Sequence, residues 1–352
     1  MRLRVALVLL VVVSLAGCGV APLPAPSPTP TAGSSVVEPP LPALPLACGD
    51  IVTSSTLAAF AGEVVPVHRD AGSTPDSWYE VAKRQHQILT CVWSADRDLA
   101  PLTVIAIPNA ATDFAAYRAG LVPNHYDRLD VVGDQSVHQC GYGQCRFEVL
   151  IGDFWVSGFA NRPTMMDDAD LEPLFLPVLT EIAAAIEAGL SERREPWEVP
   201  AGVLTGWGAG CDDTAPVADL AAALGVSNPV VASPLESDGG AWGLVTSRIA
   251  VPHCTLLNPG TSTYLGEAVV VEGGAWVTAE WAIQPPAQWD SGFYEPVEVD
   301  GVGVVYLGDE GSRWDAYVPI EGSLAWFSVE GGTREAFLAA LAAAATVVGD
   351  HG

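Results

Sequence analysis

Cysteines are the residues of this chain best suited to chemistry, and six of the seven fall into spaced pairs. Two of these pairs have the same spacing of 43 positions, and the third encloses four residues. An equal spacing in two separate segments indicates paired partners within each segment. The spacing therefore predicts three structural disulfides: Cys48–Cys91, Cys211–Cys254 and, by elimination, Cys140–Cys145.

The short Cys140–Cys145 pair has a rival interpretation as a redox or metal site. Redox motifs usually hold two residues between the cysteines, whereas this pair holds four. No cluster of His or Cys completes a metal site nearby, and His138 is the one such residue close in sequence. We therefore favour a structural disulfide between Cys140 and Cys145 that restricts the turn between these two residues.

Other catalytic patterns are missing from the sequence. The six histidines are scattered and show no zinc-hydrolase spacing, and there is no nucleophile elbow, P-loop or dinucleotide fingerprint. A Ser/His/Asp triad assembled in space stays open. The densest acids, Asp167-Asp168-Ala169-Asp170 and Asp212-Asp213, could contact Ca²⁺ weakly, but acids that begin helices explain them better. We therefore predict no catalytic residue, no cofactor-binding residue, no metal site and no cofactor.

Tryptophan is the remaining candidate for ligand contact, because its ring stacks on sugar faces and lipids when exposed. Three tryptophans fall in expected strands and are predicted to fill the core: Trp93, Trp155 and Trp326. Three others fall in segments rich in Gly, Pro and Asp and are the speculative ligand contacts: Trp242, Trp289 and Trp314.

The N-terminus has the pattern of an export signal. Two arginines precede an apolar run over residues 6–15, and the run ends in Leu15-Ala16-Gly17-Cys18. This tetrapeptide resembles the lipobox of bacterial lipoproteins, in which the cysteine carries the lipid. We expect residues 1–17 to be a signal peptide and Cys18 to be the lipidated first residue; an ordinary signal peptide is the alternative. No later apolar run looks long enough to span a bilayer.

A tether is expected after the anchor, over residues 18–46. Residues 21–45 contain nine prolines, which favour extended polyproline II and exclude a packed core. At about 3.1 Å per residue this segment reaches roughly 75 Å. Its Ser and Thr residues could carry glycans, but a bare spacer is an equal alternative.

The rest of the chain reads as two copies of one domain, residues 47–190 and 211–350, joined by a linker over 191–210. In each copy an Ala/Leu-rich helix that ends in Gly follows the first cysteine, at Gly62 and Gly225. Strands are predicted at 102–107 and 268–271, and hairpins at 146–157 and 316–327 with Gly-Asp and Gly-Ser turns. Terminal helices are predicted at 171–188 and 333–348.

Charge excludes one class of partner. The 352 residues carry 15 Lys+Arg against 42 Asp+Glu, a formal net charge of −27, and Lys83 is the only lysine. Nucleic-acid binding requires clustered cations, so it is not expected. The lipid rather than charge must hold the protein at an anionic membrane.

The first copy resembles the DUF3558-type family of actinobacterial lipoproteins of unknown function. The resemblance rests on Ala47-Cys48-Gly49-Asp50, on Cys91-Val92-Trp93, on the helical stretch 112–117 and on Gly133-Asp134-Gln135-Ser136. The second copy departs from it, because His253-Cys254-Thr255 lacks the Trp, and its middle helix is unclear, since residues 285–296 hold three Pro and a Gly. The resemblance implies an extracytoplasmic α+β fold and carries no catalytic residues.

The sequence therefore predicts an α+β protein of two tandem disulfide-bonded domains, each with helices packed on a mostly antiparallel sheet. We expect it to be extracytoplasmic and lipid-anchored through Cys18, and to act as a non-enzymatic ligand-binding or sensing module at the cell envelope. Its partners would be cell-wall glycan, lipid or an envelope protein. A scaffold of an envelope complex and a cell-wall-acting enzyme are the alternatives.

Overall fold

A computed structural model describes most of the chain after the expected signal peptide and the first part of the tether. The described residues are 38–70, 73–94, 101–121, 132–162, 168–201, 214–225, 230–232, 240–248, 253–258, 261, 263–288 and 292–351. From residue 38 onward they belong to one compact unit. Cys18 and Cys211 lie outside the described residues.

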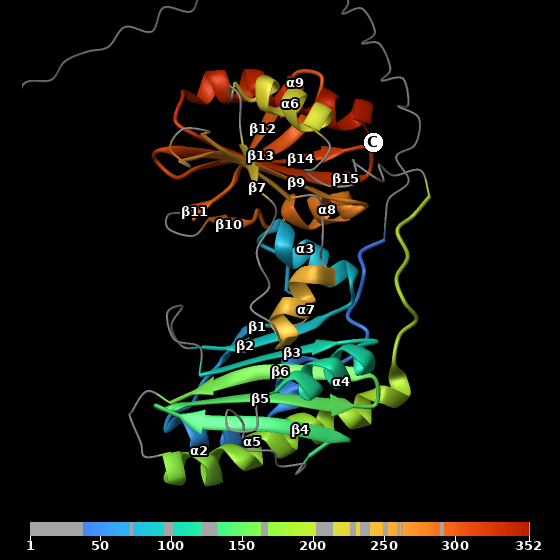
Figure 1. Ribbon diagram of the computed structural model, residues 1–352, viewed down its shortest axis with the longest axis vertical. Helices are drawn as coiled ribbons and strands as arrows, with labels where there is room; N and C mark the ends of the chain where they lie inside the picture. Colours follow the sequence, from blue (N-terminus) through green and yellow to red (C-terminus); the bar gives the residue numbers. More distant parts are fainter. Residues whose placement is uncertain are drawn as a thin grey trace, which may run out of the picture. The chain divides into compact units, whose positions relative to one another are not determined.

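The fold is α+β, as predicted, and is built on two antiparallel sheets (Figure 1). The first sheet has the order β1-β2-β3-β6-β5-β4. Its strands are β1 (Val67–Arg69), β2 (Leu89–Trp93), β3 (Leu102–Ile107), β4 (Gln135–Gly141), β5 (Gln144–Ile151) and β6 (Phe154–Asn161).

The second sheet has the order β12-β13-β14-β15-β9-β8-β7. Its strands are β7 (Val230–Ala232), β8 (His253–Leu257), β9 (Tyr264–Val271), β12 (Glu295–Val299), β13 (Gly303–Asp309), β14 (Arg313–Ile320) and β15 (Ser323–Glu330). A separate small ladder pairs β10 (Ala287–Gln288) with β11 (Gly292–Phe293). Without the edge strand β12, both sheets have the same connectivity, which supports the predicted repeat.

The helices also recur in the same order in the two repeats. They are α1 (Cys48–Ile51), α2 (Ser54–Ala61), α3 (Trp78–Gln85), α4 (Ala111–Gly120) and α5 (Asp168–Gly189), then α6 (Thr214–Ala223), α7 (Gly240–Arg248), α8 (Val277–Trp281) and α9 (Arg334–His351). Short 3₁₀ turns are η1 (Leu190–Glu192) and η2 (Gly274–Trp276). The middle helix of the second repeat is therefore η2 with α8, directly after β9, and not a helix within 285–296.

Local sequence signals explain where the elements begin and end. Thr53 caps α2 by accepting a hydrogen bond from the backbone amide of Thr56, and Gly62 ends the helix in the left-handed conformation, as predicted. The first hairpin turns at Gly152-Asp153, also as predicted. The second hairpin turns at Glu321-Gly322, one residue earlier than predicted, because both residues adopt the positive φ of a tight two-residue turn and leave Ser323 in β15.

Two predicted disulfides are confirmed. Cys48–Cys91 joins α1 to β2, and Cys140–Cys145 links a directly opposed pair in the β4–β5 hairpin. Cys254 in β8 is disulfide-bonded, and its predicted partner Cys211 lies outside the described residues.

Three apolar clusters hold the unit together. One lies between the first sheet and the helices α1, α2 and α5, and another lies between the second sheet and the helices α6 and α9, which cover one face of that sheet (Figure 1). The third cluster draws on both repeats and contains α3, α4, α7, α8 and strands of both sheets. The predicted core tryptophans Trp93, Trp155 and Trp326 are all buried.

Helix α5 meets the length and composition of a membrane span over Asp170–Glu192, contrary to the expectation that no later run would. Core helices of globular domains meet the same criterion. Here the predicted apolar stripe of Phe175, Leu179, Ile182 and Ile186 is buried against the first sheet, so a core role accounts for it.

Chain on both sides of the predicted first domain packs on that domain. Ala43 and Leu44 are fully buried in the first cluster, so the tether ends before residue 43 rather than at 46. The expected linker begins as packed chain, since Arg193 pairs with Asp153 at 2.7 Å and the Arg194 amide donates to the carbonyl of Ala43. Burial of apolar side chains, invisible in the Pro-rich composition, decides the first boundary.

Candidate ligand site at the seam between the repeats

Helices α3 and α7 each contact the other repeat. Helix α3, between β1 and β2, packs on β9 and η2 of the second repeat, while α7, between β7 and β8, packs on β6 and α4 of the first. Two matching hydrogen bonds fix them: Gln85 Nε2 donates to the carbonyl of Glu272 at 2.8 Å, and Arg248 Nη2 donates to the carbonyl of Asn109 at 2.7 Å. Arg248 lies 163 positions after Gln85 and Glu272 lies 163 after Asn109, which is also the offset between Cys48 and Cys211. The seam is thus a contact between equivalent surfaces.

The seam contains a polar pocket of about 240 Å³. The first repeat contributes β1 and the loop to α3, and the second repeat contributes the segment after α8. The lining residues are His68, Arg69, Ser73, Thr74, Pro75, Asp76, Gln284, Pro285 and Pro286. A smaller hollow of about 30 Å³ shares four of these residues and adds Lys83, Glu80 and Thr90 among others. Both repeats are therefore needed to form the pocket.

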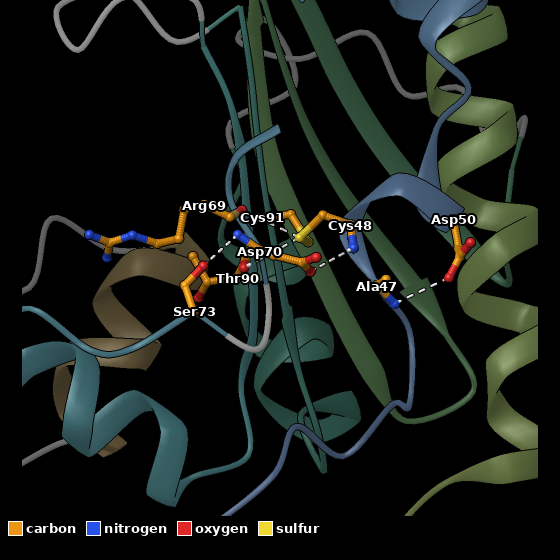
Figure 2. Close-up of a disulfide and its surroundings, with 8 residues drawn as sticks. All are labelled: Ala47, Cys48, Asp50, Arg69, Asp70, Ser73, Thr90 and Cys91. Carbon is orange, nitrogen blue, oxygen red and sulfur yellow. Dashed lines mark hydrogen bonds between the residues drawn. A yellow bond between two sulfur atoms is a disulfide. The ribbon is translucent and has the colours of Figure 1, made fainter. Parts of the chain in front are cut away.

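The loop between β1 and α3 forms one wall of the pocket, and its first residue, Asp70, is bonded to the Cys48–Cys91 disulfide region (Figure 2). The Cys48 amide donates to Asp70 Oδ1 at 3.0 Å, and the Asp70 amide donates to Ser73 Oγ at 2.9 Å. In Figure 2 the Arg69 side chain extends away from the Cys48–Cys91 bridge. The disulfide thus fixes the start of the loop while Arg69 is left to line the pocket.

The second repeat also contacts this loop. Trp281 of α8 is fully buried, and its Nε1 donates to the carbonyl of Pro75 at 2.7 Å. Ser77 caps α3 immediately after the loop by accepting from the amide of Glu80. The pocket wall is therefore positioned by covalent, capping and inter-repeat contacts.

A charge network lines the smaller hollow and extends to the larger pocket through Arg69. Glu80 Oε1 accepts from Lys83 Nζ at 2.6 Å and pairs with Arg69 Nη1 at 3.0 Å. Arg69 also pairs with Asp76. Lys83 is 3% exposed and lies over the ring of Tyr79. Burial lowers the pKa of Lys83, and the negative charge of Glu80 opposes that shift.

Arg84 extends the network across the seam. It pairs with Glu280 of α8 at 3.0 Å, donates to the carbonyl of Pro40 at 2.9 Å and lies over the ring of Trp276. One side chain therefore ties the residues before α1, helix α3 and the second repeat together beside the pocket.

One buried polar atom in the smaller hollow lacks a partner. Within the described part of the chain, Thr90 Oγ1 is buried and makes no hydrogen bond. Buried hydroxyls are normally satisfied, so an unsatisfied one that lines a polar hollow marks a place where a polar group can bind.

Other buried titratable groups lie away from this pocket. Glu148 on β5 accepts a hydrogen bond from Trp155 Nε1, and burial raises its pKa to about 8. Asp315 on β14 is buried beside Arg313, and burial raises the pKa of Asp315 as well. His138 contacts Glu172 at 2.8 Å. Among the described residues, no group of three or more His, Cys, Asp or Glu side chains could hold a metal ion.

Of the three tryptophans predicted to contact ligand, only Trp314 has a side chain that the structure describes, and it is not among the residues that line the pocket. Trp314 lies in strand β14 and packs on the cluster between the second sheet and the helices α6 and α9, so its predicted placement in a loop is wrong. Trp242 lies in helix α7, also not in a loop; its side chain and the whole of Trp289 are outside what the structure describes. Successive residues of a strand point to opposite faces of the sheet, and here Trp314 is half-buried on one face while Asp315 is buried on the other.

The pocket residues carried only a faint sequence signal. Three of the 15 basic residues of this acidic chain, including its only lysine, fall between positions 69 and 84 together with three acids. The partner segment Gln284-Pro285-Pro286 is about 200 positions away and gives no signal of its own.

Comparison with known proteins identified no relative: no family model matches the chain, and neither does any curated protein or solved structure.

Proposed function

We propose that this protein is a non-enzymatic binding module that takes a small polar ligand in the pocket at the seam between its repeats. The observation that carries the proposal is the polar pocket of about 240 Å³, which is lined from both repeats and includes Arg69, whose side chain also pairs with Glu80 in the neighbouring hollow. Sites for drug-sized ligands measure roughly 300–1,000 Å³, so this pocket suits a smaller molecule.

Charged groups buried beside a cleft support this assignment. A buried lysine is costly unless it is paired, and a network of this kind is more common at binding sites than in ordinary cores. In the pocket the guanidinium, carboxylate, imidazole and amide groups offer both hydrogen-bond donors and hydrogen-bond acceptors. Such a set suits the binding of a polar ligand rather than the cleavage of a bond in it.

The proposal also concerns where the protein lies in the cell. The lipobox-like Leu15-Ala16-Gly17-Cys18, the Pro-rich tether and the disulfides together support an exported lipoprotein whose binding unit stands off the membrane. The resemblance to actinobacterial lipoproteins is consistent with the same location. Capture or sensing of a small molecule at the cell envelope is the resulting role.

Native mass spectrometry of full-length protein purified from its host tests the binding function. We expect a bound small molecule in the wild type and its loss in Gln284→Trp, because Gln284 is exposed at the pocket and an indole there fills the space. Gln139→Trp, the same change on exposed β4 away from the pocket, is the control and should keep the ligand. An adduct of equal abundance in Gln284→Trp, or none in the wild type, would contradict the proposal.

A further inference from the structure

The β4–β5 hairpin ends in a tight turn that exposes an aromatic ring. Gly141 and Gln144 are the last paired residues, so Tyr142 and Gly143 form a two-residue turn. Both have a positive φ, of 54° and 80°, and Asn and Gly are the residues that normally occupy such a turn. Tyr142 is 91% exposed, so burial in the fold does not account for a tyrosine in this strained conformation.

The second repeat has the equivalent hairpin without the ring. The opposed pair Asp309–Trp314 of β13 and β14 lies 169 positions after the opposed pair Cys140–Cys145, and the turns of the following hairpins share this offset. The residue 169 positions after Tyr142 is Gly311, which has a φ of 79°. Glycine adopts a positive φ without strain. A turn of this shape therefore does not require the tyrosine, and the first repeat carries it at a cost in backbone strain.

Several bonds hold the turn at Tyr142 in place. The Cys140–Cys145 disulfide joins the two strands next to the turn. The carbonyl of Gly143 accepts a hydrogen bond from the amide of Arg162 at 2.8 Å, which ties the turn to the chain after β6. The ring is thus presented on a backbone that has little freedom left to lose when a partner binds.

Planar polar side chains lie beside the turn on one face of the sheet. Gln144 and Asn161 are opposed on β5 and β6, and Gln144 Nε2 donates to Asn161 Oδ1 at 2.7 Å. Arg146 lies two residues along β5 on the same face, and its Nε donates to Gln144 Oε1 at 2.7 Å. Within the described part of the chain, the Nη groups of Arg146 make no hydrogen bond. Phe159 on β6 is opposed to Arg146 and adds a second ring, which is partly exposed and belongs to none of the three apolar clusters.

This combination of groups suits a sugar. A pyranose ring has an apolar C–H face that stacks on an aromatic side chain, and hydroxyl groups that exchange hydrogen bonds with amide and guanidinium groups. A membrane surface fits less well, because the turn carries one exposed ring among polar side chains and the chain has a net charge of −27.

The position of the turn in the first sheet also favours a partner away from the membrane. The Ala43 amide donates to the carbonyl of Gln87, two residues before β2 begins. The Cys140–Cys145 pair lies in the cross-strand row of Trp93, where β2 ends. The chain that follows the expected tether therefore meets the sheet at one end of its strands, and the turn projects from the other.

We infer that this end of the first sheet binds a glycan built of pyranose rings. The site, which we call the hairpin platform, consists of Tyr142, Gln144, Arg146 and Phe159. The ring of Tyr142 stacks on a sugar, and the free donors of Arg146 bind its hydroxyl groups. The platform is separate from the pocket at the seam, so this inference stands independently of the proposed function.

Co-sedimentation of the full-length protein with insoluble chitin and with purified peptidoglycan tests the inference. We expect the wild type to be retained on at least one polymer and to be released by soluble chitohexaose, which carries the same β-linked amino sugar without peptide. No retention on either polymer overturns the inference, and so does retention that chitohexaose fails to reverse.

Variants of Tyr142 separate a binding role from a structural one. Tyr142→Asn removes the ring and introduces a residue favoured in this turn, so affinity should fall about tenfold while the melting temperature stays equal or rises. Tyr142→Phe keeps the ring and should bind as the wild type does. Ile283→Ala is the control, because it removes a side chain that is 88% exposed elsewhere in the protein and should keep the affinity.

Two results with these variants overturn the inference. One is an undiminished affinity in Tyr142→Asn, which shows that the ring does not contact the glycan. The other is a lower melting temperature in Tyr142→Asn, which shows that the ring supports the hairpin itself. Circular dichroism melting of all three variants supplies this second readout without any ligand.

Discussion

At the scale of residues, the buried acids show how burial changes protonation. Glu148 lies on the face of the first sheet that belongs to the shared cluster, opposite Ser157 and bonded to the indole of Trp155. Removal from water raises the pKa of Glu148 to about 8, so the folded protein keeps this acid protonated at neutral pH. In the unfolded chain the carboxyl of Glu148 has its ordinary pKa, so it is ionised at neutral pH.

The raised pKa makes stability depend on pH with a definite sign. Between about pH 4.5 and 8 the unfolded chain has lost the proton that the folded protein retains, so stability falls as the pH rises, by up to about 1.4 kcal/mol per pH unit. Glu148→Gln keeps an acceptor for Trp155 but cannot ionise. Urea unfolding from pH 5 to 8 should show a steeper loss in the wild type than in the variant. Parallel profiles would show that Glu148 does not titrate in this window.

At the scale of elements, the exchange of α3 and α7 between the repeats is the feature that forms the seam. Each helix is anchored by one side chain at its C-terminal end, Gln85 in α3 and Arg248 in α7, to a backbone carbonyl that follows a strand of the other repeat. Arg248 also pairs with Asp113 at 2.9 Å. Equivalent positions therefore use a neutral donor in one repeat and a charged donor in the other.

This difference predicts that replacing the two anchoring side chains by alanine lowers the stability of the protein by different amounts. Arg248→Ala should destabilise the protein by about 2 kcal/mol, because it removes charge-assisted bonds, and Gln85→Ala by about 1 kcal/mol, because it removes a neutral one. Arg146→Ala, on an exposed position of β5, is the control and should change stability by less than about 0.5 kcal/mol. Urea denaturation at pH 7 measures all three. A larger loss for Gln85→Ala than for Arg248→Ala would refute this account of the two anchors.

At the scale of the whole molecule, the chain combines a strongly acidic folded unit with an expected lipid anchor. A net charge of −27 is repelled by anionic lipid, so surface charge cannot hold the protein on a membrane. One acyl chain alone anchors only marginally, whereas two or three hold stably. Location should therefore depend on Cys18 and not on the folded unit.

Metabolic labelling with a palmitate analogue tests this dependence in the host. We expect label on the wild type and none on Cys18→Ala, with the variant moving from the membrane fraction to the soluble one. Ser14→Ala, which keeps the apolar run and the cysteine, is the control and should remain labelled. Equal labelling of wild type and Cys18→Ala would exclude lipidation at this residue.

Much of the fold could be predicted from local patterns. Equal cysteine spacing predicts the repeat and the first disulfide, and alternation and helical periodicity predict β3, the hairpins and the stripe on α5, because these signals depend on residues close in the chain. The sequence left the middle helix of the second repeat unclear. That helix is α8 with the preceding 3₁₀ turn η2, and the Pro-rich segment that follows α8 lines the pocket.

The sequence by itself determined the α+β class, the internal repeat and the cysteine pairs that the structure describes. Only the tertiary structure decided that α3 and α7 pack on the opposite repeat, and that Arg69 and Asp76 line one pocket with Gln284 across the seam. The physical reason is the distance along the chain over which the deciding interactions act. Secondary structure follows from neighbours along the chain, whereas the pocket depends on which apolar faces bury one another, and that free energy belongs to the assembled unit.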